Sequence, residues 1–185
     1  CQKVSEAEVM AEGGVENILV SSEVVSASKL RRLAALTRHT KLMVVVDHPK
    51  GAEMLSAAMK AVGSEIGVLV DVDVGQGRCG VLPGAPAVEL AQRVDRLSGL
   101  HLRGIQAYQG TAQHVEGFDV RMNVNAEAIG KIKKIVSDFE ASGLSTDVRS
   151  GGGTGTWRWD VEAGVLNELQ AGSYVLMDGD YARLD

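Results

Sequence analysis

Continuous apolar runs alternate with amphipathic segments along the whole chain. Runs such as 43–46 predict strands buried on both faces, and apolar residues spaced like Leu30, Leu33 and Ala34 predict helices. The predicted strands are 17–22, 42–47, 66–73, 102–109, 146–150 and 165–170. The predicted helices are 5–12, 28–38, 50–62, 87–97 and 123–142. Strands that alternate with helices in this way indicate a parallel sheet covered by helices.

Polar residues stand at the end of every predicted strand. They are Ser21, Ser22, Asp47, His48, Asp71, Asp73, Tyr108, Gln109, Ser150 and Gln170. In a (β/α)8 barrel the carboxyl ends of all strands meet at one ligand-binding face, whereas a doubly wound sheet needs polar ends only at its switch point. We therefore expect an α/β fold, a TIM-type (β/α)8 barrel in a single domain, 1–185. Since such barrels usually need about 250 residues, roughly two strands would be missing.

A glycine-rich segment, RSGGGTGT at 149–156, follows the fifth predicted strand. Glycines lack Cβ, so successive backbone N–H groups can turn toward one anion, and two threonine hydroxyls add donors. A second donor-rich turn, AGSY at 171–174, follows the next strand. Two adjacent strand-to-loop junctions of this kind predict a phosphate site in a barrel. The alternative is a flexible loop without a ligand.

Composition and charge narrow the class of protein. Of the 185 residues 45% are hydrophobic, which is enough for a real core, and the net charge of −5 comes without a basic patch. We therefore expect a small-molecule ligand and no nucleic acid. No apolar run approaches a membrane span, no signal peptide is visible, and Cys1 and Cys79 suit neither a disulfide framework nor a metal site. The expected location is cytoplasmic, without membrane association.

The first residues predict a helix that begins almost at once. Ser5 and Glu8 have the spacing of a capping box, which places the start of a helix near residue 6. The chain also begins on Cys1 without a methionine. We expect it to be a piece of a longer polypeptide.

Three residues near strand ends could carry chemistry. Arg78 lies among glycines after the third strand and could donate to an oxyanion or phenolate, or could simply pair with a nearby aspartate. Tyr108 could contact a planar ligand and His114 could act as a general base; the alternative is a rim tyrosine and a surface histidine. Weaker candidates for lining the mouth are Thr111, Asp47 and Asp178, and the roles of Trp157 and Trp159 stay open.

Several motifs, in this order along the chain, resemble one enzyme family. They are CQKVSEAE (1–8), GRCGV (77–81), QAYQG (106–110), QH (113–114), GTGT (153–156), NELQAGSY (167–174) and MDGDY (177–181). The chain resembles the D-threonine and 3-hydroxy-D-aspartate aldolases, pyridoxal 5'-phosphate enzymes with an alanine-racemase-like N-terminal barrel. The resemblance implies a lyase that cleaves D-3-hydroxy amino acids to glycine and an aldehyde, helped by a divalent metal (Mn, Mg or Zn), and a homodimer.

The resemblance also implies roles for individual residues. Arg78 would donate to the O3' phenolate of the cofactor and Tyr108 would contact it near the reacting end, while His114 would help to remove the proton of the substrate's 3-hydroxyl. Gln170 would face the ring nitrogen, and Gln2 would face the site from the end of the second family strand. The phosphate would be held by Gly153, Thr154, Gly155, Thr156, Gly172, Ser173 and Tyr174. Arg158 is a possible partner for a second substrate carboxylate.

Two family features are missing from the chain. The Schiff-base lysine of the family lies in a His-x-Lys-Thr-type motif at the end of its first strand, and no such motif occurs here. The metal ligands of the family lie in a C-terminal β domain that the sequence does not contain. The resemblance therefore implies a truncated barrel, without the first strand, most of the second strand and the C-terminal domain. It would be inactive by itself.

Three other functions stay open at this point. One is a D-serine or 3-hydroxy-D-aspartate dehydratase of the same family, which expels the 3-hydroxyl instead of breaking a carbon–carbon bond. Another is a non-catalytic barrel that binds pyridoxal phosphate. The third is an unrelated barrel that binds a sugar phosphate.

Overall fold

Six parallel strands form one curled sheet in the computed structural model, which describes residues 1–177 and 179–184. The strands are β1 (Asn17–Val20), β2 (Lys41–Val46), β3 (Ile66–Asp71), β4 (Leu100–Ala107), β5 (Val148–Gly151) and β6 (Glu168–Leu169). Their order in the sheet, β1-β2-β3-β4-β5-β6, equals their order in the chain. A doubly wound sheet would reverse direction at a switch point, so this order defines part of a barrel.

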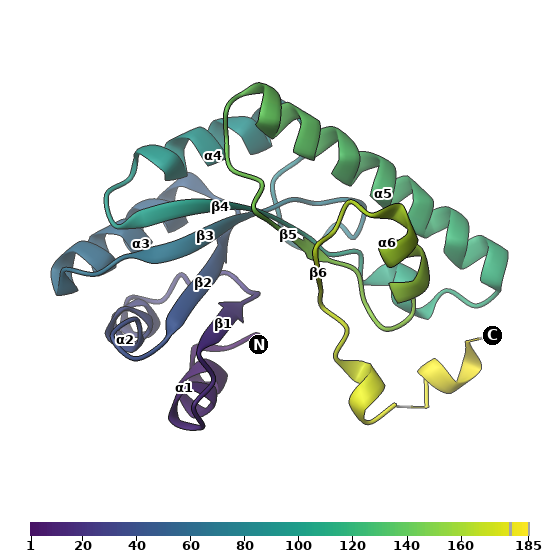
Figure 1. The fold of residues 1–185 in the computed structure, drawn as a ribbon, viewed down its shortest axis with the longest axis horizontal. Coiled ribbons are helices and arrows are strands. Elements are labelled where there is room, and N and C mark those ends of the chain that lie inside the picture. The colour runs from purple at the N-terminus through teal and green to yellow at the C-terminus, as the bar shows by residue number, and fades with distance from the viewer. Residues whose placement is uncertain (178, 185) are drawn as a thin grey trace.

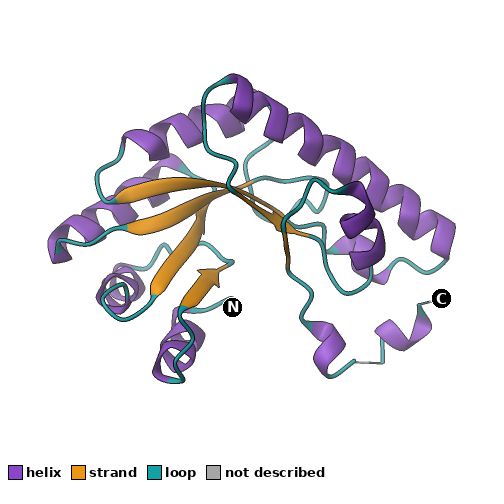
Figure 2. Cartoon of the chain, viewed as in Figure 1, coloured by secondary structure: helices purple, strands orange, loops and turns teal. Residues whose placement is uncertain are grey.

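Helices cover the outer, convex side of the sheet (Figures 1 and 2). They are α1 (Val4–Glu12), α2 (Ala27–Leu36), α3 (Pro49–Val62), α4 (Ala85–Arg96), α5 (Phe118–Ala141) and α6 (Trp157–Ala163). Short 3-10 turns follow at η1 (Thr111–His114), η2 (Ser173–Val175) and η3 (Tyr181–Arg183). The sheet bends around a concave inner side that remains open between its two ends in Figure 1.

The core lies between the sheet and this outer layer of helices. Val44, Val68 and Ile105 of the strands are buried in one cluster with Leu33 of α2 and Leu55 of α3. Burying each such side chain contributes about 1.5–3 kcal/mol. The helices are therefore held by their apolar stripes, and the strand ends are left to carry polar residues.

A β-bulge in the middle of the sheet sets the register of the site. The pairing of β3 with β4 shifts between Val68 and Leu69, and Gly104 opposite has φ +139. A Cβ on Gly104 would collide with the carbonyl of Val148, so this position requires glycine. After the shift Asp71 pairs with Gln106, which pairs in turn with Ser150, and Ser150 with Glu168. Four polar residues thus form one row across the sheet.

The start of the chain differs from the sequence prediction. Helix α1 begins at Val4, and the Glu6 carboxylate accepts N–H bonds from Gln2 (2.8 Å) and Lys3 (3.1 Å). The predicted capping box of Ser5 and Glu8 is therefore wrong, because Glu6 performs the capping and Glu8 instead pairs with Arg32. The Cys1 ammonium donates to Leu19 and the Cys1 carbonyl accepts from Ser21, so the first residue pairs alongside β1.

One helix begins earlier than predicted, and another was not predicted. Helix α5 begins at Phe118, five residues before the predicted start at 123, because Gly117 with φ +85 turns the chain directly into it. Helix α6, which follows the glycine-rich loop, was not predicted because its seven residues are too few to show a helical pattern. Strand β6 is confined to two residues.

Candidate functional site

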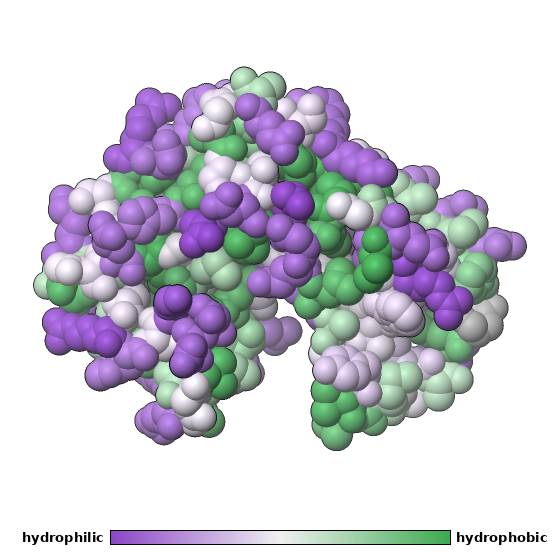
Figure 3. Space-filling model, viewed as in Figure 1, coloured by the Kyte–Doolittle hydropathy of each residue, from purple (hydrophilic) through white to green (hydrophobic). Residues whose placement is uncertain are grey.

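A cavity of about 1060 Å³ opens at the carboxyl ends of the strands. In Figure 3 a notch separates the region near the N-terminus from the C-terminal segments. Residues of both regions line the cavity, including Gln2 and Ser21 on one side and Ser173 and Tyr181 on the other. The convergence expected for strand ends of a barrel is therefore observed.

Most of the residues selected from the sequence line this one cavity. They are Gln2, Arg78, Tyr108, His114, Thr154, Gln170, Gly172 and Ser173, together with the weaker candidate Thr111. The turns near Thr154 and Gly172 meet because they follow the neighbouring parallel strands β5 and β6. Gly153, Gly155, Thr156 and Tyr174 do not line the cavity, and no lysine does among the residues that the structure describes.

The glycine-rich loop uses much of its hydrogen-bonding capacity internally. The N–H of Gly153 donates to Asp160 (3.4 Å), and the N–H of Gly155 donates to Gln113 Oε1 (2.8 Å). The buried Thr156 hydroxyl donates to Asp160 (2.6 Å) and accepts from Gln113 Nε2 (2.9 Å). This differs from the expectation that these three residues present their donors to an anion.

Close packing explains why the loop contains glycines. A Cβ on Gly153 would collide with the Gln113 side chain, and one on Gly155 would collide with the Gln113 backbone. Gln113 is 1% exposed and lies in η1, far from the glycines in sequence. The glycines therefore leave room for the buried Gln113 side chain and backbone. From the sequence alone this reason for the glycines could not be distinguished from anion binding.

Thr154 is the exception in this loop. Its hydroxyl oxygen is buried and has no hydrogen-bond partner among the described residues, and Thr154 lines the cavity. A buried hydroxyl without a partner is costly, so it marks a place for a polar ligand atom. On the facing turn, a Cβ on Gly172 would meet nothing within 4 Å, so there is space for such a ligand. This pair of turns fits a phosphate group.

Arg78 extends along the cavity beside an aromatic ring. Its guanidinium lies 5.9 Å from the centroid of the Tyr108 ring. The predicted alternative, an ion pair with Asp71 or Asp73, is not found in the described part of the chain. Asp73 instead accepts N–H bonds from Gly75 (2.9 Å) and Gly77 (3.0 Å). Burial raises the pKa of Asp73, but these bonds outweigh it and the net shift is downward.

Tyr108, His114 and Tyr181 form an aromatic wall of the cavity. Burial raises the pKa of the Tyr108 hydroxyl, with a further rise from Tyr181 and an opposing effect of Arg78. The His114 ring packs against Tyr181 with 4.7 Å between centroids. Sequence reasoning assigned no role to Tyr181, although it lies within the MDGDY motif. Because its pKa is raised, the Tyr108 hydroxyl keeps its proton at neutral pH and can donate a hydrogen bond.

Buried amide groups lie behind the cavity. Gln106 is 1% exposed, and its Nε2 donates to the carboxyl of Asp71 (2.9 Å). Burial, with added repulsion from Glu23 and Asp47, raises the pKa of Asp71 to about 7. Sequence reasoning assigned no role to Gln106; a glutamine inside an otherwise apolar strand was the available signal.

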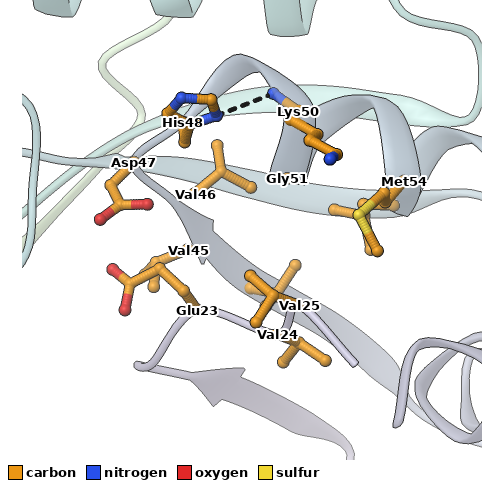
Figure 4. A pocket seen from close by; sticks show the side chains of 12 residues that line it. Glu23, Val24, Val25, Val45, Val46, Asp47, His48, Lys50, Gly51 and Met54 are labelled. Carbon is orange, nitrogen blue, oxygen red and sulfur yellow. Dashed lines mark hydrogen bonds between the residues drawn. The ribbon is translucent and has the colours of Figure 1, made fainter. Parts of the chain in front are cut away.

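A second, mostly apolar cavity of about 410 Å³ lies beside α3. Asp47, a weaker candidate for the mouth, lies in this second cavity instead, with its carboxylate near that of Glu23 in Figure 4. Glu23, Asp47 and Cys79 offer ligand atoms within 4.8 Å of one another. Glu23 and Asp47 of this cluster add to the effect of burial, which is the main cause of the raised pKa of Asp71.

Helix α6 places three other candidates outside the main cavity. Trp159 packs edge-on against Phe118 with 5.0 Å between centroids, and Arg158 lies over Trp157. These residues line a neighbouring pocket that shares Thr154 and Tyr181 with the main cavity. Arg158 itself does not line the main cavity, and its contact with a substrate carboxylate stays a prediction. The candidate Asp178 lies outside the described residues.

The fold and this site define an alanine-racemase-type barrel, and comparison with known proteins agrees. The family "Alanine racemase, N-terminal domain" matches residues 1–179, and the chain belongs to it. The chain is 43% identical over 185 residues to a 3-hydroxy-D-aspartate aldolase of Paracoccus denitrificans strain Pd 1222. This match covers 100% of the chain and 48% of that protein.

Two further relatives carry the same class of name. A D-threonine aldolase of an Arthrobacter species is 44% identical over 181 residues, covering 98% of the chain and 48% of its own length. The crystal structure of D-threonine aldolase from Filomicrobium marinum matches with a TM-score of 0.98 and 44% identity, covering 100% of the chain and 50% of that protein. The resemblance to these aldolases is confirmed, and the chain spans about half the length of the curated relatives it matches.

Within 1–177 and 179–184, no helix combines the length and the apolar character that crossing a bilayer requires.

Proposed function

We propose that this chain is the cofactor-binding barrel portion of a pyridoxal-phosphate aldolase that cleaves D-3-hydroxy amino acids, such as D-threonine or 3-hydroxy-D-aspartate, to glycine and an aldehyde. The observation that carries the proposal is the unpartnered, buried Thr154 hydroxyl in the same cavity as Arg78 and Tyr108. Two relatives at 43% and 44% identity with aldolase names support it.

The cavity offers suitable groups for each part of this cofactor. Thr154, Gly172 and Ser173 would hold the phosphate between two neighbouring turns. Arg78 would donate a charge-assisted hydrogen bond to the ring phenolate, and Tyr108 would position the ring. Gln170 would meet the ring nitrogen, and Gln2 lines the wall formed by the start of the chain. Gly153, Gly155 and Thr156 support the phosphate turn from behind through Gln113 and Asp160.

The residues of this chain would prepare the substrate for carbon–carbon cleavage. The bound cofactor supplies an electron sink for the pair released from the broken Cα–Cβ bond. His114, exposed at the mouth and held against Tyr181, would take the proton of the 3-hydroxyl as a general base. The aromatic wall would exclude water from the reacting carbon. Arg158, in the pocket that shares Thr154 and Tyr181 with the main cavity, stays the candidate for binding a second substrate carboxylate.

Several further properties stay predictions. A longer polypeptide would contribute the Schiff-base lysine and the ligands of the divalent metal. The homodimer and the cytoplasmic location likewise rest on the resemblance and the composition alone.

A product assay on the full-length protein tests the proposed function. D-Threonine, 3-hydroxy-D-aspartate and D-serine are supplied with pyridoxal phosphate and a divalent metal. We expect glycine and an aldehyde, and we expect Arg78→Ala to lower kcat/KM roughly ten- to a hundredfold because a charge-assisted hydrogen bond is lost. Arg38→Ala, a surface arginine outside the cavity, serves as the control.

Two outcomes of this assay contradict the proposal. A keto acid as the main product identifies a dehydratase instead, and absence of any product with bound cofactor indicates a non-catalytic barrel. The 185-residue chain alone gives a further check. Because no lysine lines the described cavity, borohydride treatment with pyridoxal phosphate should place adducts on exposed surface lysines only, as peptide mapping would show.

A further inference from the structure

A row of polar side chains, of which Asp71, Gln106 and Ser150 are buried, crosses the sheet behind the cavity. Gln106 Nε2 donates to Asp71 Oδ1 (2.9 Å) and to the carbonyl oxygen of Ser21 (3.2 Å). Gln170 Nε2 donates to Gln106 Oε1 (2.9 Å) and to Ser150 Oγ (3.0 Å), and Ser150 Oγ donates to Glu168 (2.6 Å). Gln106 and Ser150 are 1% and 0% exposed, so neither can exchange these partners for water.

The groups at the two ends of this row determine which atom of each amide donates and which accepts. The backbone carbonyl of Ser21 has no hydrogen to give, so the Gln106 atom that faces it must be the nitrogen. The Oε1 atom of Gln106 therefore faces Gln170. Since this oxygen can only accept, the Gln170 atom that bonds to it must be the nitrogen. At the other end, Ser150 gives its only hydrogen to the Glu168 carboxylate and accepts from Gln170. Both ends require the same orientation of Gln170.

This orientation leaves one atom of Gln170 without a role in the row. Both hydrogens of Nε2 are directed at Gln106 and Ser150, and Gln170 lines the cavity. No donor in the described part of the chain reaches Oε1. Gln170 Oε1 is thus free to accept a hydrogen bond from a ligand in the cavity. A ligand atom that contacts this oxygen must therefore carry a hydrogen.

We propose that Gln106 is a positioning residue that locks Gln170 with its carbonyl oxygen toward the cavity, so that the site selects a ligand with an N–H or O–H group there. The inference rests on the proposed function for the identity of that group, which is then the protonated ring nitrogen of pyridoxal phosphate. An amide free to rotate would accept either protonation state, whereas a locked carbonyl stabilises only the protonated one. A proton on this nitrogen strengthens electron withdrawal by the ring.

The protonation state of the ring nitrogen can be measured directly. The full-length protein is loaded with pyridoxal phosphate labelled with ¹⁵N in the ring, and the ¹⁵N chemical shift is followed against pH. We expect a protonated nitrogen in the unchanged protein. Gln106→Met and Gln170→Met should each lower the proton affinity of the nitrogen about tenfold, because one buried hydrogen bond is lost, and so move the titration down by about one pH unit.

Two further variants separate this role from a general loss of structure. Gln170→Glu retains an acceptor toward the ring and should keep the nitrogen protonated. Gln92→Met, on α4 outside the cavity, should leave the titration unchanged. If Gln106→Met does not fold, the Gln170→Met and Gln170→Glu pair tests the acceptor, because Gln170 is only partly buried. Gln106→Glu, which keeps the size of the side chain, then tests the positioning role and should move the titration in the same direction as Gln170→Met.

The possible failures are distinguishable. A bound cofactor whose ring nitrogen is unprotonated in the unchanged protein overturns the inference and leaves the proposed function intact. So does a titration that Gln106→Met and Gln170→Met do not move. If the unchanged protein takes up no pyridoxal phosphate at all, the proposed function fails and the inference fails with it.

Discussion

At the scale of single residues, Asp71 shows how the environment changes the chemistry of one carboxyl group. It is 5% exposed, and burial raises its pKa from 3.8 to about 7, with Glu23 and Asp47 adding to the effect. A buried carboxyl with this pKa binds a proton over a pH range in which an exposed one has lost it. The same carboxyl group accepts a hydrogen bond from Gln106, so its protonation changes the strength of one bond in the row behind the cavity.

The raised pKa of Asp71 predicts that stability changes with pH. Between about pH 4 and 7 the folded state retains a proton that the unfolded chain releases, so the free energy of unfolding falls as the pH rises. The slope for this one proton is at most roughly 1.4 kcal/mol per pH unit. Asp71→Asn should remove that slope, as urea unfolding at a series of pH values would show. Asp95→Asn, at an exposed aspartate of α4, is the control, and an unchanged slope in Asp71→Asn contradicts the assignment.

At the scale of elements, the sequence was sufficient for the order of strands and helices. Buried parallel strands need continuous apolar runs, and such runs at 43–46 and 66–70 are hard to mistake. Helix α6 was missed because seven residues are too few to show a helical period. The start of α5 was missed because it depends on the backbone conformation of Gly117 rather than on an apolar pattern.

The candidate site was predictable to the extent that it follows from topology. Strand-end residues such as Arg78, Tyr108 and Gln170 converge because all strands are parallel, and the polar residues that follow them were visible in the sequence. The internal bonding of the glycine-rich loop was not predictable. It depends on Gln113 and Asp160, whose approach to the loop is set by packing between α5, η1 and α6.

Helix α6 is expected to hold the glycine-rich loop through Asp160. This residue is 1% exposed and accepts from Gly153, Thr156 and Asn125, the last at 3.0 Å. Asp160→Ala should lower the free energy of unfolding by about 2–4 kcal/mol, since it leaves several buried donors without an acceptor. Glu162→Ala, on the exposed side of the same helix, should change it by less than about 0.5 kcal/mol. Denaturant unfolding measures both, and equal losses would exclude this role of Asp160.

At the scale of the whole molecule, the described chain exposes both apolar surface and strand edges. Strands β1 and β6 each have a neighbouring strand on one side only in the described sheet. At η2, Val175 and Leu176 are 68% and 91% exposed, next to the exposed Tyr174 and Met177. Figure 3 shows this hydrophobic surface at the rim of the notch. Either feature can drive association between copies of the chain.

The apolar segment at η2 should dominate self-association of the 185-residue chain, because burial of a valine or leucine contributes about 1.5–3 kcal/mol whereas an edge as short as β6 offers few backbone groups. Replacing both Val175 and Leu176 by lysine should therefore weaken association at least about tenfold in sedimentation equilibrium. Val161→Lys, at an exposed valine of α6, controls for the added charge. Association that persists in the double variant would instead identify the strand edges as the cause, and then a proline at the exposed first residue of β1, Asn17, should reduce it.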